Sequence, residues 1–96
     1  MKVILLPQAQ QELAEAFNFY EQQLNGLGTL FSKELLETID LICLYPEGWH
    51  LITKRTRKCP LHKFPYMILY GIIDHIIVIS SIAHQHRRPS SYLDRN

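Results

Sequence analysis

The chain has 96 residues, enough for one domain with a real core but too few for a deep cavity of its own. Hydrophobic residues make up 47% and charged residues 20%, which is typical of a globular protein and argues against disorder, and no apolar run approaches the roughly 20 residues of a membrane span. A formal net charge of +1 is low for a protein whose main partner is naked nucleic acid.

The N-terminus and the cysteines point to the cytoplasm. The apolar run Lys2–Leu6 is followed by a proline and is too short for a secretory signal. Cys43 and Cys59 make no disulfide framework, and free thiols fit a reducing compartment. We therefore expect a cytoplasmic protein.

The first half of the chain predicts a strand followed by two helices. Lys2–Leu6 forms the strand, and Pro7 suits the first turn of the first helix. Apolar side chains recur at steps of three and four along both helices, which gives each helix one core face. These side chains are Ala9, Leu13, Ala16, Phe17, Tyr20 and Leu24 in the first helix, and Phe31, Leu35, Thr38, Ile39 and Ile42 in the second.

Turn and cap residues mark the ends of the two helices. The segment Asn25–Gly28 contains residues that tolerate positive φ, so the first helix ends there. Thr29 is expected to cap the second helix, which ends at Tyr45 because Pro46 disfavours the helical region for the residue before it. The two helices are therefore predicted to form a hairpin that lies across a sheet and covers it.

The second half predicts three further strands. Trp49–Arg57 is interpreted as a weaker strand with basic character, and residues 58–63 as a loop. Phe64–Ile73 and Ile76–Ile82 are rich in β-branched and aromatic residues, and Asp74–His75 between them forms a tight turn. Because apolar residues occupy both parities of Phe64–Ile73, we expect this strand inside the sheet rather than at its edge.

The predicted fold class is α+β, with residues 1–96 in a single domain. An N-terminal strand and a two-helix hairpin precede a three-stranded antiparallel meander, and the strands form one twisted, mostly antiparallel sheet of about four strands. Tyr20, Tyr66 and Tyr70 fall in core patterns, so we expect them to pack with their hydroxyls bonded.

A basic cluster follows the last predicted strand. His84, His86, Arg87 and Arg88 fall where that strand ends, at one mouth of the sheet. Acidic residues, in contrast, concentrate before residue 50. We therefore expect a cationic rim, carried on an acidic first half, that an outside macromolecule grips.

Local signatures recur along the chain in a fairly specific order. They are Phe19-Tyr20-Glu21 ending the alanine-spaced first helix, Gly26-Leu27-Gly28 followed by Phe31, Tyr45-Pro46, Phe64-Pro65-Tyr66 with Tyr70, and His84 followed by Arg87, Pro89, Tyr92 and Arg95. In this order the chain resembles the RelE/ParE superfamily of toxins from bacterial type II toxin-antitoxin systems. The resemblance covers nearly the whole chain and implies a RelE/ParE-like fold.

The resemblance also implies a growth-inhibiting toxin that a cognate antitoxin neutralises in a hetero-oligomer. In this superfamily the antitoxin wraps an otherwise disordered segment over the toxin's basic surface and apolar grooves. Members that resemble ParE poison DNA gyrase, and members that resemble RelE cut messenger RNA on the ribosome. We favour a ParE-like toxin that acts by binding. The alternatives are a RelE-like ribosome-dependent mRNA endonuclease and a degenerate, non-toxic member that still pairs with an antitoxin.

The candidate site residues follow from these readings. Metal-free RNA cleavage needs a base, an acid and cations around the phosphate. The catalytic candidates, for a nuclease only, are His84, Arg87 and Tyr92, and the candidates for binding the target or the antitoxin are Lys54, Arg55, Arg57, Lys63, His86, Arg88 and Arg95. Messenger-cutting relatives tend to carry an arginine directly after the tyrosine that opens the central strand. This chain has Met67 there, which cannot hold a phosphate.

Other roles stay open for these residues. His84 and His86 put two imidazoles on one strand face, but no cysteine or carboxylate lies near them in sequence, so we expect no metal and no cofactor. His84 also suits a structural role, with a hydrogen bond to backbone at the strand end. The arginines are also candidates for ordinary solvated charges, since surface arginines are common.

Overall fold

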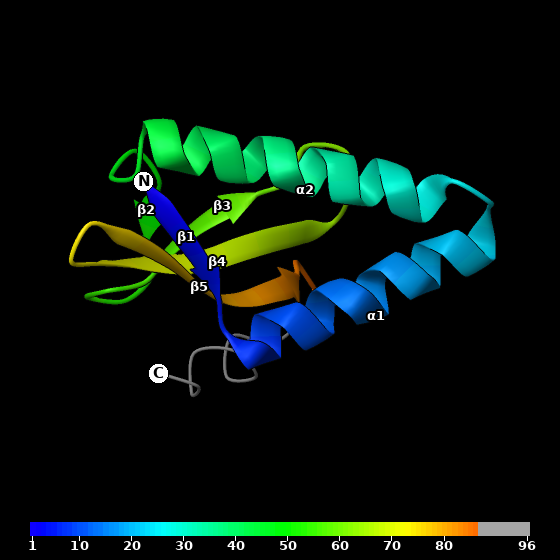
Figure 1. The fold of residues 1–96 in the computed structure, drawn as a ribbon, viewed down its shortest axis with the longest axis horizontal. Helices are drawn as coiled ribbons and strands as arrows, with labels where there is room; N and C mark the ends of the chain where they lie inside the picture. Colours follow the sequence, from blue (N-terminus) through cyan, green and yellow to red (C-terminus); the bar gives the residue numbers. More distant parts are fainter. Residues whose placement is uncertain (87–96) are drawn as a thin grey trace.

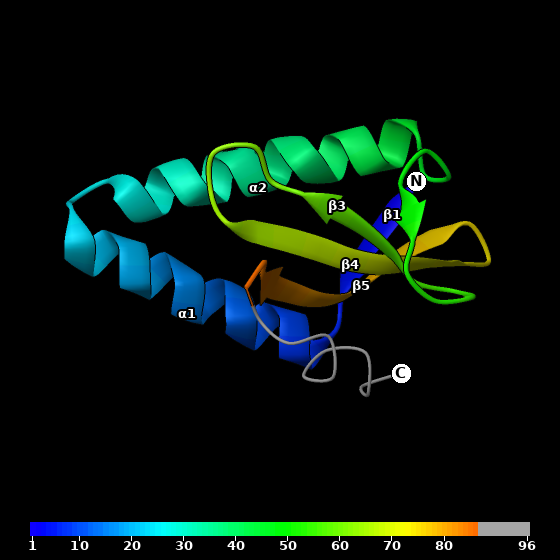
Figure 2. The same ribbon diagram turned by 180° about the vertical axis from the view of Figure 1, so that it is seen from behind.

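Two helices lie across one face of a five-stranded sheet (Figures 1 and 2). The computed structural model describes residues 1–86. Its elements are β1 (Lys2–Leu5), α1 (Pro7–Gln23), α2 (Leu27–Leu44), β2 (His50–Leu51), β3 (Arg57–Pro60), β4 (Tyr66–Ile73) and β5 (Ile76–His84). The strand order is β1-β5-β4-β3-β2, with β1 parallel to β5 and the other pairs antiparallel. The predicted α+β class is therefore confirmed, and the sheet is mixed.

The sheet has one strand more than predicted. The expected strand Trp49–Arg57 is wrong as one unit, because β2 covers only His50–Leu51 and a turn separates it from β3. The expected loop 58–63 is wrong at its start, where Lys58–Pro60 belongs to β3 and pairs with β4. Proline fits this strand because β2 ends before it, so no ladder hydrogen bond is required of Pro60 on that side.

The second helix begins earlier than predicted. Gly26, with φ of +92°, is the residue before α2, and Thr29 lies inside the first turn instead of capping it. The carboxylate of Glu21 takes over the capping role, because it accepts the backbone N–H of Gly26 at 2.9 Å and that of Gly28 at 3.0 Å. A side chain near the end of α1 thus fixes the start of α2.

Gly28 allows the two helices to approach closely. A Cβ atom there would lie 2.7 Å from the carbonyl oxygen of Phe17 and 2.9 Å from Oε1 of Glu21. We expect Gly28→Ala to lower the free energy of unfolding by about 1–3 kcal/mol, the usual cost of overpacking. Urea denaturation measures this, and Thr29→Ala, at an exposed position in the same turn, is the matched control. Equal midpoints for the two variants would contradict the close contact.

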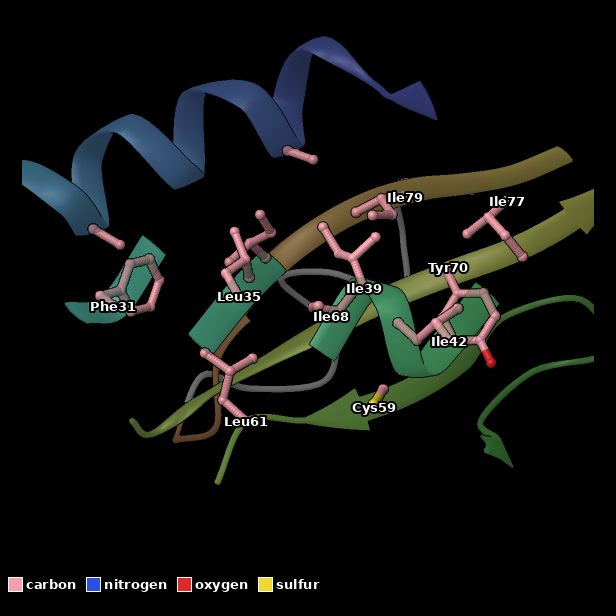
Figure 3. Close-up of a cluster of buried hydrophobic side chains, with 13 residues drawn as sticks. Phe31, Leu35, Ile39, Ile42, Cys59, Leu61, Ile68, Tyr70, Ile77 and Ile79 are labelled. Atoms are coloured by element: carbon pink, nitrogen blue, oxygen red, sulfur yellow. The ribbon is translucent and has the colours of Figure 1, made fainter. Parts of the chain in front are cut away.

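The core fills the space between the helices and the sheet (Figure 3). It consists of Ala9 and Ala16 from α1, Phe31, Leu35, Ile39 and Ile42 from α2, and Cys59, Leu61, Ile68, Tyr70, Ile77, Ile79 and Ile82 from the sheet and its loops. As expected, the Tyr70 hydroxyl is bonded, and it donates to the carbonyl oxygen of Pro46 at 2.7 Å. Leu24, expected in the core, is exposed because α1 ends before it. Neither helix in the described part of the chain has the length and apolarity needed to cross a bilayer.

Two ionisable groups in this core make the free energy of unfolding depend on pH in the alkaline range. Burial raises the pKa of the Cys59 thiol from 9.0 to about 11. It also raises the pKa of Tyr70 from 10.0 to about 12, with the charge of Arg57 opposing the rise. The folded state keeps protons that the unfolded chain releases, so the free energy of unfolding should fall as pH rises from about 9 toward 12. Urea midpoints across this range test the decline, and Tyr70→Phe should make it shallower above pH 10.

Candidate functional site

A groove of about 890 Å³ lies at the end of the sheet where β4 turns into β5. Gly71 of β4 and Val78 and Ser80 of β5 form part of its lining. Side chains alternate along a strand, and the neighbouring Tyr70 and Ile79 face the helices, so these three residues lie on the opposite face of the sheet. We call this site the basic groove. Its wall carries cationic side chains, and its floor is formed by small, largely apolar residues.

The wall of the basic groove is the turn between β2 and β3. The backbone N–H of Ile52 donates to the carbonyl oxygen of Thr56 at 2.8 Å, and the backbone N–H of Thr56 donates to Oγ1 of Thr53 at 3.0 Å. These bonds hold Lys54 and Arg55 exposed at the tip of the turn. No ion pair joins either side chain to a carboxylate within residues 1–86. Both charges are therefore available to a partner.

Arg57 is also part of this wall, but its guanidinium is already engaged. Its Nη1 donates to the carbonyl oxygen of Trp49 at 2.7 Å and to that of Glu47 at 3.1 Å. These bonds tie the loop after α2 to β3 and so fix the base of the turn. Arg57 thus supports the wall that presents Lys54 and Arg55.

Gly71 lets the turn close over β4. A Cβ atom at this position would lie 3.0 Å from the carbonyl oxygen of Arg55. Any side chain there would push the turn away from the strand. Sequence analysis did not single out Gly71, although a glycine inside an apolar strand is a known sign of close approach by another backbone.

The remaining candidates in the described part of the chain lie at the opposite end of the sheet. The register pairs Tyr66 with His84, whereas Gly71 lies beside Arg55. Five residues of strand separate Tyr66 from Gly71, which corresponds to roughly 17 Å. Lys54 and Arg55 therefore do not share one rim with His84 and His86.

At that end of the sheet, His84 takes a structural hydrogen bond. The backbone N–H of His86 donates to Nδ1 of His84 at 3.2 Å, as expected for a backbone contact at a strand end. The His84 ring also contacts Tyr66 and His86, with centroid separations of 5.1 and 5.2 Å. Lys63 lies in the loop before β4, where its backbone N–H donates to Glu34 at 3.0 Å. No set of three metal-ligating side chains gathers within residues 1–86.

The position expected to carry an arginine in a nuclease is apolar and buried. Met67 packs with Leu69 and Ala83, and Ile52 covers this small cluster. Four further candidates, Arg87, Arg88, Tyr92 and Arg95, lie outside the described residues. The described residues therefore form a cationic binding groove, and they place no phosphate-binding side chain at position 67.

Glu12 supports the end of β5, a role that sequence analysis missed. Its carboxylate, only 4% exposed, accepts the backbone N–H of Ile82 at 3.1 Å and the hydroxyl of Ser81 at 2.9 Å. Because β1 ends opposite Ile79, this carboxylate occupies the place of a strand partner beyond that point. The helical spacing of Glu12 from Ala9 was the available signal, since residues three apart share a face.

Comparison with known proteins gives the chain a family context. The family described as the ParE toxin of the type II toxin-antitoxin system, parDE, matches residues 3–89. A solved structure of the chromosomal ParDE system from P. aeruginosa is similar at a TM-score of 0.77 and 14% identity, covering 88% of this chain and 95% of that one. The isolated E. coli RelE toxin is similar at a TM-score of 0.67 and 18% identity, covering 98% and 96%. At such identities the two structures show the fold alone, and no curated protein matches the sequence.

Proposed function

Because this chain belongs to the ParE toxin family of type II toxin-antitoxin systems, we propose that it arrests growth by binding DNA gyrase and that its antitoxin neutralises it through the basic groove. A ParE-type toxin has a cognate antitoxin as its partner, so the proposal concerns the target and the surface. Gyrase as the target places the action in the cytoplasm.

The feature that carries the proposal is a pair of cations that have no ion-pair partner within residues 1–86 and that stand above a largely apolar floor. Lys54 and Arg55 stand exposed at the tip of the turn, and Gly71 and Val78 lie beneath them. An antitoxin segment with alternating acidic and apolar side chains would meet both features, with carboxylates on the cations and an apolar side chain on the floor. Such a segment can be disordered in the unbound antitoxin and fold when it binds the toxin.

The same groove supports binding rather than RNA cleavage. General acid-base catalysis requires the acting groups to lie within hydrogen-bond reach of the same reacting atoms. Lys54 and Arg55 lie roughly 17 Å from the sheet end that carries His84, far beyond that reach. Met67 adds no phosphate-binding group between them.

Two candidate residues outside the basic groove, Lys63 and His86, are given a different role in this proposal. Lys63 and His86 are exposed at the other end of the sheet. A wrapping antitoxin segment that continues from Lys54 and Arg55 along the sheet would reach them. We assign them to antitoxin contact, and we assign His84 to holding the strand end.

A supercoiling assay tests the proposed target. Full-length toxin added to purified gyrase, ATP and relaxed plasmid should abolish supercoiling, and added antitoxin should restore it. A parallel assay with translating ribosomes should leave the messenger intact. Cut transcripts with normal supercoiling would overturn the proposal in favour of a RelE-like nuclease, and activity in neither assay would indicate a non-toxic member.

A further inference from the structure

A second, smaller groove is lined by residues of α2 and β3. These two elements pass close to each other on one side of the molecule (Figure 2). The groove is a hollow of about 320 Å³, lined among others by Glu37 and Leu41 of α2, Trp49, and Pro60 of β3. β2 pairs only with Arg57 and Lys58, so the outer side of β3 has no strand partner at Pro60 in the described part of the sheet. We call this hollow the acidic groove.

Exposed apolar residues on α2 continue from the acidic groove. Leu36 and Leu44, which are 62% and 68% exposed, stand eight positions apart, and Leu41 and Tyr45 stand four apart beside them. Positions four apart share a helix face, so Asp40 lies between Leu36 and Leu44 in one row, and the other pair forms a neighbouring row. Clustered exposed apolar residues of this kind mark interaction surfaces more often than isolated ones do.

The charged side chains that α2 and the loop after it bring to this surface are acidic from Glu34 onward. No lysine or arginine occurs between Lys33 and Lys54, whereas four acidic residues do. Glu34 is engaged, since its carboxylate accepts the backbone N–H groups of the loop before β4. Glu37 and Asp40 have no ion-pair partner within residues 1–86.

The helix itself adds to this negative potential. The last turn of α2 contains no basic residue, although the C-terminal end of a helix carries partial negative charge that cations stabilise. Asp40 lies near this end and adds a like charge. A cation supplied from outside would therefore be favourable here, and this decides the chemistry of the partner.

We propose that the acidic groove and the adjoining α2 face dock a basic, apolar segment of a second protein. A lysine or arginine of that segment would lay its aliphatic stem along Leu41 and bring its charge to Glu37 or Asp40. A neighbouring apolar side chain would cover Leu36 or Leu44.

This site goes beyond the proposed function, because it selects the opposite charge from the basic groove. An acidic antitoxin segment suits Lys54 and Arg55 and is repelled by Glu37 and Asp40. Both grooves can therefore be occupied at once by segments of opposite charge. The toxin would then link its antitoxin to a further basic partner instead of exchanging one for the other.

The single tryptophan of the chain makes the acidic groove directly measurable. The probe is an amidated, tryptophan-free helical peptide in which arginine and leucine share one face, titrated into the full-length toxin. Trp49 fluorescence should change and saturate with this peptide. The same peptide with glutamate in place of each arginine should cause no change.

Two matched double variants locate the binding. Glu37→Gln with Asp40→Asn should raise the dissociation constant roughly tenfold, while Glu15→Gln with Asp74→Asn removes the same charge elsewhere and should leave it within about twofold. Equal effects of the two double variants, or equal binding of the glutamate peptide, would overturn the proposal.

Two further measurements complete the test. Light scattering that shows toxin dimers dissolved by Glu37→Gln with Asp40→Asn would also overturn the proposal, because the occupant would then be a second copy. Gyrase inhibition should persist in this double variant, so failure of the acidic groove and failure of the proposed target are distinguishable.

Discussion

Reversing both charges at the tip of the β2–β3 turn, Lys54→Glu with Arg55→Glu, is expected to weaken antitoxin binding by roughly 100-fold or more. Each charge-assisted hydrogen bond contributes about 1.5–3 kcal/mol, and each 1.4 kcal/mol corresponds to about tenfold in affinity. Both side chains are exposed and make no hydrogen bond or ion pair within residues 1–86, so the fold of these residues should be unchanged. Isothermal titration of full-length toxin with its antitoxin measures the loss, and gyrase inhibition by the same variant shows whether target and antitoxin share the basic groove.

A single cation elsewhere provides the control for this variant. Lys33 is exposed on α2, outside the basic groove. Lys33→Glu should change antitoxin affinity by less than about threefold and should be compared with Lys54→Glu alone. Full affinity in the double variant would remove the basic groove from antitoxin recognition. A large loss in Lys33→Glu would indicate that net charge, not position, governs binding.

Truncating Phe31 should produce the largest loss of stability. Phe31 is fully buried, and its ring lies 5.4 Å from Tyr20, 5.3 Å from Phe64 and 5.3 Å from Tyr66, centroid to centroid. Phe31→Ala should lower the free energy of unfolding by about 3–5 kcal/mol, through lost burial and the cavity left behind. A domain of this size has a total stability of about 5–14 kcal/mol, so a large fraction of the variant would be unfolded on mild heating.

The neighbouring Leu30 gives a matched control for Phe31. It lies one residue earlier in the same helix but is exposed. Leu30→Ala should change the free energy of unfolding by less than about 0.5 kcal/mol. Circular dichroism during urea denaturation measures both variants. A similar, small shift for Phe31→Ala would mean that the aromatic cluster contributes little to the fold.

The central hairpin was predictable because its signals are local. Apolar residues at both parities of β4 predict a strand inside the sheet, and β4 indeed lies between β5 and β3. The tight turn between the strands is confirmed, since Asp74 and His75 have φ of 50° and 63°. Such positive values are typical of two-residue hairpin turns. Pattern and turn chemistry therefore agreed before any long-range contact was considered.

Elements that depend on distant partners were not predictable. The start of the expected loop, Lys58–Pro60, has weak strand preference and becomes β3 because β4 offers it a ladder. Glu12 is polar, yet it is buried because its partners Ser81 and Ile82 lie 69 and 70 residues away. The local sequence therefore predicts neither the strand at residues 58–60 nor the burial of Glu12.

The candidate site was predictable only in part. Lys54 and Arg55 were named from their charge, but their separation from His84 follows from the antiparallel register on both sides of β4. Lys54 and Arg55, which precede β3, therefore lie at one end of β4, and His84 at the end of β5 lies at the other. The floor of the basic groove, including Gly71, required the same register to be known.

The parallel pairing of β1 with β5 has a consequence for how this protein is made. Lys2 pairs with Ile76, so a strand synthesised early can dock only after a strand synthesised late has emerged from the ribosome. Until then, the nascent helices present an uncovered apolar side that chaperones can recognise. If translation stopped before Ile76, β1 would have no strand to pair with. Toxic activity should therefore appear only after β5 has been synthesised, and products that terminate earlier should be harmless.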